Sequence, residues 1–533
     1  MLKFYVFTPT RLACVTLLGG CALLAGGCGG GGSVPSAATV TVPQNSTSYT
    51  VGTFAKSSTS AAQCAVPRTG TADKSGSITL ENFWLRSWSH ELYLWYAELP
   101  DLNPANYTST ETYFNLLKTS ATTSSGTAKD RFHFTYNTAD WLALSQSGVS
   151  AGYGAEWVLV VRAPPREMRI AFVEPSSPAA SAGLARGMKV ISVDSADLVN
   201  GNTQTVFDTL NAGLSPSAAN QTHTFVLENL AGVRRTVSLT SANITSTPVQ
   251  NVNTIRTSNG LTVGYILFND HIATSEQQLV SAFNTLRQAN VSDLILDLRY
   301  NGGGYLDIAS EVAYMIAGDT ATSGKTFERL RFNSQYPVTT NPVTGGALSP
   351  TSFLKVSQGF SGPSGVALPT LNLPRVLVLT GSGTCSASEA ILNGLRGVGI
   401  TVIQIGSTTC GKPYGFYPQD NCGTTYFTIE FDGVNEQGNG GYSDGFSPSN
   451  SQSAVGVSLP GCSVADDFTH ALGDVVEGRL AAALAYRQNS VCPGPASGVA
   501  GPSALVQSKA SDGADGLSLQ EKNPLRTNRI LSH

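Results

Sequence analysis

Between residues 264 and 405 the sequence alternates short apolar runs with segments of helical periodicity, and this alternation restricts the fold more than any other feature. The apolar runs occur at residues 264–268, 294–298, 376–379 and 402–405. The first helical segment, residues 275–289, places Leu279, Ala282, Phe283 and Leu286 on one face. Strands that alternate with helices form a sheet covered by those helices, so we expect an α/β fold.

Two short motifs follow the last two apolar runs. The string SASE, which begins at Ser386, opens a helix-like segment, and the string GK ends at Lys412. A serine needs a base to become a nucleophile, and a lysine can serve when burial lowers its pKa. The two residues are 412 − 386 = 26 positions apart, which leaves room for one helix, one strand and two turns. This pair predicts a hydrolase with Ser-Lys chemistry.

A third stretch, residues 294–304, reads as a buried strand that runs into a glycine loop with the sequence DLRYNGGG. With SASE and GK following in this order, it resembles the C-terminal processing peptidases, or tail-specific proteases. That family shows a DLRxNxGG loop, a SASE nucleophile turn and a GK lysine. The resemblance spans roughly residues 80 to 460. It implies a crotonase-like (ClpP-like) spiral βα core at residues 255–488, with an inserted or preceding PDZ domain and a helical N-terminal region.

The resemblance also implies a role for each motif. Ser386 would be the nucleophile and Lys412 the general base of a Ser-Lys dyad that works through an acyl-enzyme intermediate. Backbone N–H groups of Ala387 and Gly304 would form the oxyanion hole, because glycine lets the backbone approach a ligand closely. Ser388 is the alternative nucleophile. The family implies no cofactor, and the sequence shows no metal-binding motif.

Each of these residues also has a simpler structural interpretation. Ser386 could be only a helix N-cap, with Glu389 three positions later completing a capping box. Lys412 could be a solvent-facing loop lysine, and the glycine loop a tight turn without a ligand. His271 follows Asp270 and suggests a Ser-His-Asp triad, but we expect a surface histidine there. Asp297 and Arg299 are expected to serve core or loop structure.

The chain departs from the family pattern just after the lysine. Many members carry a glutamine four residues after it, which orients the amine, whereas this chain has Phe416 at that position. Gln419 is the nearest glutamine and is therefore a candidate orienter of the lysine. The departure leaves open a second function, a catalytically decayed PDZ-bearing lipoprotein that binds extracytoplasmic partners. An acyl-CoA hydratase of the same fold is disfavoured, because coenzyme A is intracellular.

Residues 150–245 resemble a PDZ domain, on the string VEPSSPAASAGLARGMKVI that begins at residue 173. A PDZ groove accepts an extended peptide as an added strand and holds its C-terminal carboxylate on backbone N–H groups. The candidate carboxylate loop consists of Gly152, Tyr153 and Gly154. The substrates would then be proteins or peptides selected through their C-termini. A PDZ fold that acts only as a spacer is the alternative.

The first 28 residues are typical of a bacterial lipoprotein signal peptide. Lys3 and Arg11 supply its positive charge, and the apolar residues 12–27 fall short of the roughly 20 that a membrane-spanning helix needs. The string LAGGC resembles a lipobox whose cysteine, Cys28, would carry lipid, and Cys21 is a rival site. We expect a lipid anchor in the bacterial cell envelope, at the outer membrane facing the periplasm or the cell surface.

The remaining segments are assigned from composition. Residues 29–76 and 489–533 are rich in small and polar residues and are expected to be a flexible tether and a disordered tail. Cys64 is the exception, as a candidate attachment of the tether to the folded body. Residues 77–148 are expected to be helical and rich in aromatic side chains. The string DRF at residues 130–132 also occurs near the end of the family's N-terminal helical region.

Six cysteines remain beyond the leader and Cys28, and an even number in an exported chain predicts disulfide bonds. They are Cys64, Cys385, Cys410, Cys422, Cys462 and Cys492. Cys410 and Cys422 flank a turn-rich segment and are the best local pair, although other pairings and free buried thiols stay open. The chain contains no CxxC string, so the spacing does not suggest zinc.

Composition excludes one class of partner. The formal net charge of the 533 residues is −4, so no basic excess indicates nucleic-acid binding. The sequence therefore predicts an exported, lipid-anchored serine endopeptidase with protein or peptide substrates. It does not indicate an oligomeric state.

Overall fold

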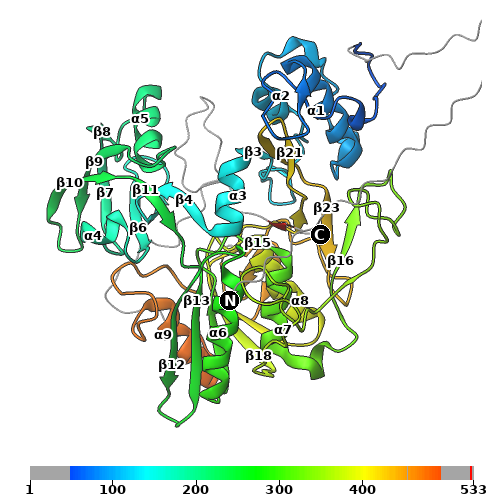
Figure 1. Cartoon of the computed structure of the whole chain (residues 1–533). Coiled ribbons are helices and arrows are strands. Elements are labelled where there is room, and N and C mark those ends of the chain that lie inside the picture. The colour runs from blue at the N-terminus through cyan, green and yellow to red at the C-terminus, as the bar shows by residue number, and fades with distance from the viewer. Residues whose placement is uncertain (1–47, 453, 494–528, 531–533) are drawn as a thin grey trace, which may run out of the picture. The chain divides into compact units, whose positions relative to one another are not determined.

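A computed structural model of the chain describes residues 48–452, 454–493 and 529–530 (Figure 1). The expected signal peptide, with Cys21 and Cys28, and the first part of the expected tether lie outside these residues. Within the described ranges, no helix combines the length and the apolar character that crossing a membrane requires.

A six-stranded sheet forms the centre of the α/β region, in the order β12-β13-β14-β18-β19-β26. Its strands are β12 (Val249–Arg256), β13 (Thr262–Phe268), β14 (Asp293–Asp297), β18 (Arg375–Thr380), β19 (Thr401–Gly406) and β26 (Gly461–Ser463). All neighbours pair in parallel except β12, which is antiparallel to β13. The four apolar runs are strands β13, β14, β18 and β19, so the α/β prediction is confirmed.

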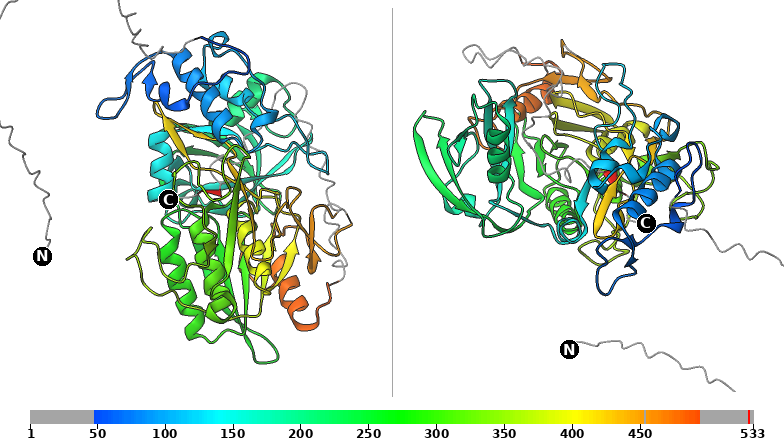
Figure 2. Two further views of the ribbon diagram at one scale, coloured as in Figure 1. Left: turned by 90° about the vertical axis from the view of Figure 1, so that its right-hand side faces the viewer. Right: turned by 90° about the horizontal axis from the view of Figure 1, so that it is seen from above.

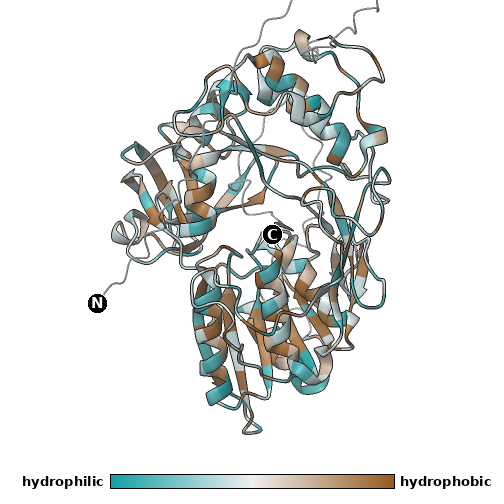
Figure 3. Ribbon diagram, turned by 45° about the vertical axis from the view of Figure 1, so that its right-hand side comes forward, coloured by the Kyte–Doolittle hydropathy of each residue, from teal (hydrophilic) through white to brown (hydrophobic). Residues whose placement is uncertain are grey.

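Helices bury both faces of this sheet. They are α6 (Ser275–Gln288), α7 (Leu306–Thr322), α8 (Ala387–Gly397) and α9 (Gly478–Asn489). Ile266 and Phe268 of β13 pack in one core with α6, α7 and α8, whereas Tyr265 and Leu267 point into a second core with α9. Figure 2 shows the green helices and the orange α9 on opposite sides, and Figure 3 shows apolar strands between them. This two-sided burial explains why these strands are almost continuously apolar.

A second sheet organises the middle lobe, as we call residues 149–245. Its order is β10-β9-β7-β6-β5, with β8 (Ala196–Asp197) against β7. The other strands are β5 (Ala155–Val161), β6 (Glu167–Val173), β7 (Lys189–Val193), β9 (Thr222–Glu228) and β10 (Arg234–Thr240). β4 (Val149–Gly152) pairs with β11 (Ala242–Thr245), and the helices are α4 (Pro178–Ser181) and α5 (Gln204–Leu214). β5 ends the sheet order, and its Trp157 Nε1 donates to Leu214 O of α5 at 3.2 Å.

The N-terminal region combines helices and short strands. They are η1 (Ser57–Thr59), β1 (Gln63–Cys64), β2 (Lys74–Ser75), α1 (Ile78–Leu92), η2 (Tyr96–Glu98), η3 (Pro104–Asn106), α2 (Thr110–Leu116), β3 (Phe134–Asn137) and α3 (Thr138–Ser147). Ser77 caps α1 by accepting the Leu80 N–H at 3.3 Å. Trp84, Trp88 and Phe114 form an aromatic core here, as the aromatic pattern predicted.

The prediction of a flexible tether at residues 29–76 is wrong for residues 48–76, the part that the structure describes. Ser57 Oγ donates to Glu91 Oε2 of α1 at 2.5 Å. A disulfide joins Cys64 to Cys422. Composition suggested a stalk, but these contacts attach residues 48–76 to the folded body.

Smaller sheets complete the fold. One has the order β17-β16-β23-β20, from β16 (Thr326–Phe332), β17 (Thr351–Ser352), β20 (Tyr414–Gly415) and β23 (Phe431–Val434). Another joins β3 to the hairpin of β21 (Gln419–Asn421) and β22 (Thr424–Phe427), and β24 (Phe446–Pro448) pairs with β25 (Val457–Leu459). The last is β15 (Gly304–Tyr305) with β27 (Arg529–Ile530). The tail predicted to be disordered therefore contributes at least one strand.

All six cysteines form disulfides, which confirms the prediction that they are paired. The pairs are Cys64–Cys422, Cys385–Cys410 and Cys462–Cys492. The expected Cys410–Cys422 pair is wrong, because the fold brings Cys410 against Cys385 and Cys422 against the N-terminal region. Cys492 also ties the start of the expected tail to β26.

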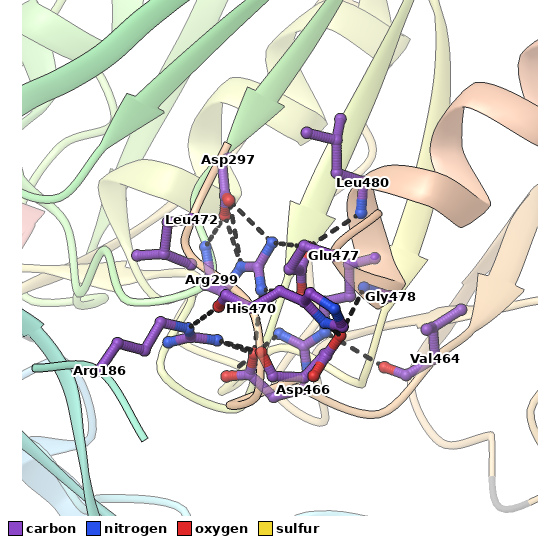
Figure 4. Close-up of polar contacts among 12 residues, drawn as sticks. Arg186, Asp297, Arg299, Val464, Asp466, His470, Leu472, Glu477, Gly478 and Leu480 are labelled. Carbon is purple, nitrogen blue, oxygen red and sulfur yellow. Dashed lines mark hydrogen bonds and ion pairs between the residues drawn. The ribbon is translucent and has the colours of Figure 1, made fainter. Parts of the chain in front are cut away.

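A buried cluster of charges joins the middle lobe to the central sheet (Figure 4). The guanidinium of Arg299 is fully buried and reaches Glu477 at 2.7 Å, Asp466 at 2.9 Å and Asp297 at 2.9 Å. Arg186, from the middle lobe, reaches the same Asp466 at 2.7 Å. The structural role expected for Asp297 and Arg299 is confirmed.

Candidate active site

The candidate nucleophile lies at a strained turn between β18 and α8. Ser386 is fully buried and has φ 62° and ψ −114°, which a residue other than glycine rarely adopts. Its Oγ has no hydrogen-bond partner among the described residues. Ser386 and Glu389 nevertheless take up the capping-box arrangement at the start of α8, so the simpler interpretation is compatible with the structure. Ala387 is the first residue of α8, where a backbone N–H has no intrahelical acceptor.

Lys412 lies in the loop after β19 and is completely buried. Its Nζ is 4.4 Å from the ring centroid of Phe416 and 4.8 Å from that of Phe132. Burial lowers the pKa of Lys412 to about 7, although the carboxylates of Asp130 and Glu389 oppose this shift. The solvent-facing interpretation is wrong, and the amine can lose its proton near neutral pH.

Glu389 connects the nucleophile turn with the lysine loop. Its Oε2 accepts the backbone N–H of Ser386 at 2.9 Å and that of Lys412 at 2.8 Å. Its Oε1 accepts the N–H of Gly411 at 2.8 Å and the hydroxyl of Thr409 at 2.5 Å. Burial raises the pKa of Glu389, and these four hydrogen bonds counteract the rise. The sequence suggested only a capping role, whereas the structure gives this carboxylate contacts to both motifs.

The glycine loop packs directly on the nucleophile turn. Asn301 O accepts the N–H of Cys385 and the hydroxyl of Ser388, each at 3.1 Å. Gly304 has φ 137°, and a Cβ there would lie 2.4 Å from His271 O, so only glycine fits. The structure therefore brings the loop of Gly304 to the turn of the candidate nucleophile. Ser388, the alternative nucleophile, instead donates to this loop.

His271 is not the surface residue that we expected. It is fully buried, its Nδ1 lies 2.9 Å from Asn301 Oδ1, and its backbone N–H donates to Gly303 O at 3.1 Å. Burial lowers the pKa of His271 to about 3, although hydrogen bonds to Asn301 and Gly303 oppose the shift. The neutral imidazole contacts the glycine loop through Asn301. The same loop covers the end of β13, which His271 follows, and so keeps His271 from solvent.

The DRF string contributes to the site from the N-terminal region, which sequence reasoning did not foresee. Arg131 Nη2 donates to Cys410 O at 2.7 Å, and the Phe132 ring packs near Lys412 Nζ. Asp130 is buried and accepts a hydrogen bond from Tyr93 at 2.7 Å. Only the occurrence of this string could have suggested its position beside Lys412.

Two other candidates lie elsewhere. Gln419 is in β21, where its side-chain amide donates to Asp420 O at 3.1 Å, so its proposed role in orienting the lysine gains no support from its contacts. Phe416 is the side chain beside the amine. Tyr153 is buried in the middle lobe with its hydroxyl donating to Gly213 O at 3.0 Å, and the loop that contains it connects β4 with β5.

One group of potential metal ligands exists among the described residues, but it does not offer thiolates. Cys385, Glu389 and Cys410 lie close together. Their two sulfur atoms are bonded to each other. The group therefore lacks the free sulfur ligands that a zinc site of this kind needs.

Comparison with known proteins agrees with the order of these motifs. Residues 262–416 match the family described as "Peptidase family S41", and residues 81–136 match "Peptidase S41 N-terminal domain". A carboxyl-terminal-processing protease of Picosynechococcus sp. is 25% identical over 278 residues, which are 51% of this chain and 56% of that protein. The chain thus spans little more than half the length of this curated relative.

The fold resembles that of one solved S41 protease structure. An S41 protease structure from Bacteroides fragilis aligns with a TM-score of 0.55 and 22% identity over 76% of this chain and 97% of its own. The photosystem II D1 C-terminal processing protease aligns with a TM-score of 0.42 and 19% identity, over 72% of this chain and 94% of its own. Residues 81–136 and 262–416 are thus similar to the N-terminal and peptidase domains of family S41, and the curated relative is a carboxyl-terminal-processing protease.

Proposed function

We propose that this protein is a serine endopeptidase in which Ser386 is the nucleophile and Lys412 the general base. One observation carries the proposal: a single buried carboxylate, Glu389, binds the backbone of both residues, and the pKa of the lysine is about 7. A lysine with an ordinary pKa would be protonated at neutral pH and could not accept a proton.

The geometry supports an acyl-enzyme mechanism. Ser386 Oγ attacks the carbonyl carbon of the scissile peptide and transfers its proton to Lys412 Nζ. The N–H groups of Ala387 and Gly304 stabilise the oxyanion, and Lys412 then protonates the leaving amine. Water, activated by the same amine, hydrolyses the ester. Burial of both side chains strengthens each electrostatic contact in these steps.

The substrate would be an unstructured protein segment. The middle lobe would act as a PDZ domain and bind the C-terminus of that segment. β5 has a sheet neighbour on one side only within the described residues, and it lies against α5. An extended C-terminus could add as a strand along β5, with its carboxylate on the backbone of Gly152, Tyr153 and Gly154. We also propose that the catalytic core has a crotonase-like fold.

The location is also a proposal. Three disulfides favour an oxidising compartment, and the LAGGC string favours a lipid on Cys28. We infer a lipid anchor in the bacterial cell envelope, at the outer membrane.

Labelling with a fluorophosphonate tests the assignment. The wild-type chain should form a stoichiometric adduct at Ser386 and should hydrolyse an unfolded protein, and Ser386→Ala should do neither. The control is Ser388→Ala, which should keep the adduct. A folded wild-type chain with neither adduct nor hydrolysis would favour the decayed, non-enzymatic binding lipoprotein. An adduct that persists in Ser386→Ala would move the nucleophile to another serine.

A further inference from the structure

A disulfide bond joins the two motifs of the active site. Cys385 directly precedes Ser386, and Cys410 lies two positions before Lys412. We propose that the Cys385–Cys410 disulfide holds the nucleophile turn and the lysine loop in register, so that its reduction switches the peptidase off. This inference rests on the proposed function and concerns how the same site is regulated.

The bond acts on short segments that already carry the site's other contacts. The N–H of Cys385 donates to Asn301 O at 3.1 Å, so the half-cystine also fixes the loop that leads to Gly304. On the other side, Arg131 holds Cys410 O at 2.7 Å. A displacement on the order of 1 Å in a catalytic group can cost about 100-fold in rate. Release of either segment is therefore expected to affect turnover more than stability.

Glu389 makes the site sensitive to the state of the sulfur atoms. The Sγ of Cys410 lies 3.5 Å from Glu389 Oε2, the oxygen that accepts the N–H groups of Ser386 and Lys412. In the disulfide this sulfur has no proton. After reduction, the Cys410 thiol could donate to the same oxygen and compete with those N–H groups. A bonded pair of sulfurs is also much closer than two thiols can pack, so reduction pushes the segments apart.

The redox step needs a dithiol, either a small molecule or a protein. Its thiolate attacks one sulfur of the bond, and its second thiol resolves the mixed disulfide. The S–S bond breaks, Cys385 and Cys410 each gain one electron and one proton, and the dithiol becomes a disulfide. Cys385 is buried and Cys410 is partly exposed, so the Cys410 sulfur is the accessible point of attack. A chain in a reducing compartment would lack the bond and remain inactive until it is oxidised.

A paired comparison separates this role from ordinary stabilisation. The test variant is Cys385→Ala/Cys410→Ala, and the control is Cys462→Ala/Cys492→Ala. The two bonds close loops of similar length, with sequence separations of 25 and 30, so their effects on the unfolded chain are similar. At a temperature where both variants are folded, the test variant should lose roughly 100-fold in kcat, and the control should keep its kcat. Similar rates in both variants would overturn the proposal.

Redox titration of the wild type adds a reversible readout. Peptidase activity should fall as Cys385 and Cys410 become available to a thiol-alkylating reagent, as followed by mass spectrometry, and should return on reoxidation. Hydrogen exchange should accelerate in peptides covering residues 382–390 and 407–415 on reduction, even in an inactive Ser386→Ala chain. If the oxidised wild type is inactive, the proposed function fails, and exchange still decides the disulfide's role. Unchanged exchange, or full activity after reduction, would contradict it.

A second strand, β27, lies at the edge of the loop that contains Gly304. β27 pairs in parallel with β15, which places Arg529 opposite Gly304 and Ile530 opposite Tyr305. β20, which begins two residues after Lys412, also contacts β27. We infer that β27 (Arg529–Ile530) occupies, in cis, the edge of the active site where a peptide substrate would pair, and that it inhibits the proposed peptidase.

Backbone pairing of this kind does not depend on a particular side-chain sequence, so a chain segment can take the place of a substrate. A tethered segment acts at an effective concentration on the order of millimolar, and even weak pairing then competes with dilute substrate. Substrates presented at high local concentration would displace it.

Peptide binding tests this inference without relying on catalysis. A labelled peptide with the sequence of residues 524–533 is added to two Ser386→Ala chains, one complete and one lacking those residues. The truncated chain should bind it, and the complete chain should bind it much more weakly, while the same peptide with Arg529→Pro and Ile530→Pro should bind to neither, because proline removes the backbone donors. In the active background, the truncation should raise kcat/KM for a short peptide. Equal binding by both chains, or none by either, would overturn the inference.

Discussion

The carboxylate of Glu389 accepts the backbone N–H of Lys412 at 2.8 Å, and both residues are completely buried. Because the same oxygen accepts the N–H of Ser386, this contact fixes the proposed general base relative to the proposed nucleophile. Glu389, which caps α8, therefore binds two loops that are separated in the sequence by α8 and β19.

Glu389→Gln should lower kcat by about 10- to 100-fold. The amide keeps one acceptor oxygen but leaves two of the four donors unpaired, at roughly 1–3 kcal/mol each. A loss of about 1.4–2.8 kcal/mol of this total from the transition state corresponds to the expected fall in rate. Loss of the negative charge should also lower the pKa of Lys412 further and move the pH–rate profile to lower pH. The control is Glu311→Gln, because burial raises the pKa of that glutamate to about 9 and the acid is already neutral. Equal effects of the two variants would contradict the role of Glu389.

The activity should increase with pH through about pH 7. Burial lowers the pKa of Lys412 to about 7, and only the neutral amine accepts the serine proton. Below that value the rate should rise about tenfold per pH unit, and above it the rate should reach a plateau. The measurement is kcat/KM for a short peptide between pH 5 and 9. Lys412→Arg should be inactive throughout, since arginine keeps its proton, and an optimum below pH 6 would argue for a carboxylate base.

Arg299→Met should destabilise the protein by about 3–5 kcal/mol, because it leaves the buried carboxylates of Asp297 and Glu477 without their cation. The control is Arg331→Met, which breaks an exposed pair with Asp432 and should cost about 0–1 kcal/mol. The free energy of unfolding from urea titration measures both.

The same cluster should make the protein sensitive to acid. Burial by itself would raise the pKa of Glu477, but hydrogen bonds and the charge of Arg299 outweigh burial and lower it. A carboxylate with a lowered pKa stabilises the fold above its ordinary pKa, about 4, and this contribution is lost as the pH falls below that value. Wild type should lose more stability than Arg299→Met between pH 5 and 3.

Substrates with a free, apolar C-terminus should be cut faster than their amide-capped forms. The carboxylate is the group that the backbone of Gly152, Tyr153 and Gly154 would bind, so capping should raise KM without changing kcat. Deletion of the middle lobe would remove the ion pair between Arg186 and Asp466 and could unfold the protein. Leu159→Pro in β5 is therefore the better variant. Proline removes a backbone donor of that strand. If capped and free peptides are cut equally fast, the lobe is a spacer.

Cys28→Ser should release the protein from the membrane fraction, since acyl chains supply the affinity. Mass spectrometry of the wild type should find diacylglycerol on Cys28. The control is Cys21→Ser, which should remain bound. Lipid on Cys21 would move the cleavage site and keep the lipoprotein assignment, and an unmodified soluble chain would contradict it.

Local patterns in the sequence predicted the strands and helices of the central α/β region. Helical and apolar periodicity predicted β13, β14, β18, β19 and α6, because these strands are buried on both faces and this helix buries one side. The order of the glycine loop, SASE and GK indicated the family. Composition failed at residues 48–76, where a disulfide and hydrogen bonds to α1 outweigh a polar, small-residue sequence.

The sequence by itself determined the α/β core, the pairing of its six body cysteines in some arrangement, and the candidates Ser386 and Lys412, because each depends on neighbours within one element or one motif. Only the tertiary structure decided that Cys410 joins Cys385, that Glu389 holds both motifs, that Phe132 and Phe416 enclose the lysine amine, and that His271 is buried. These contacts join segments that periodicity treats as independent. Their partners are fixed by the packing of loops at the carboxyl ends of parallel strands, which no local pattern encodes.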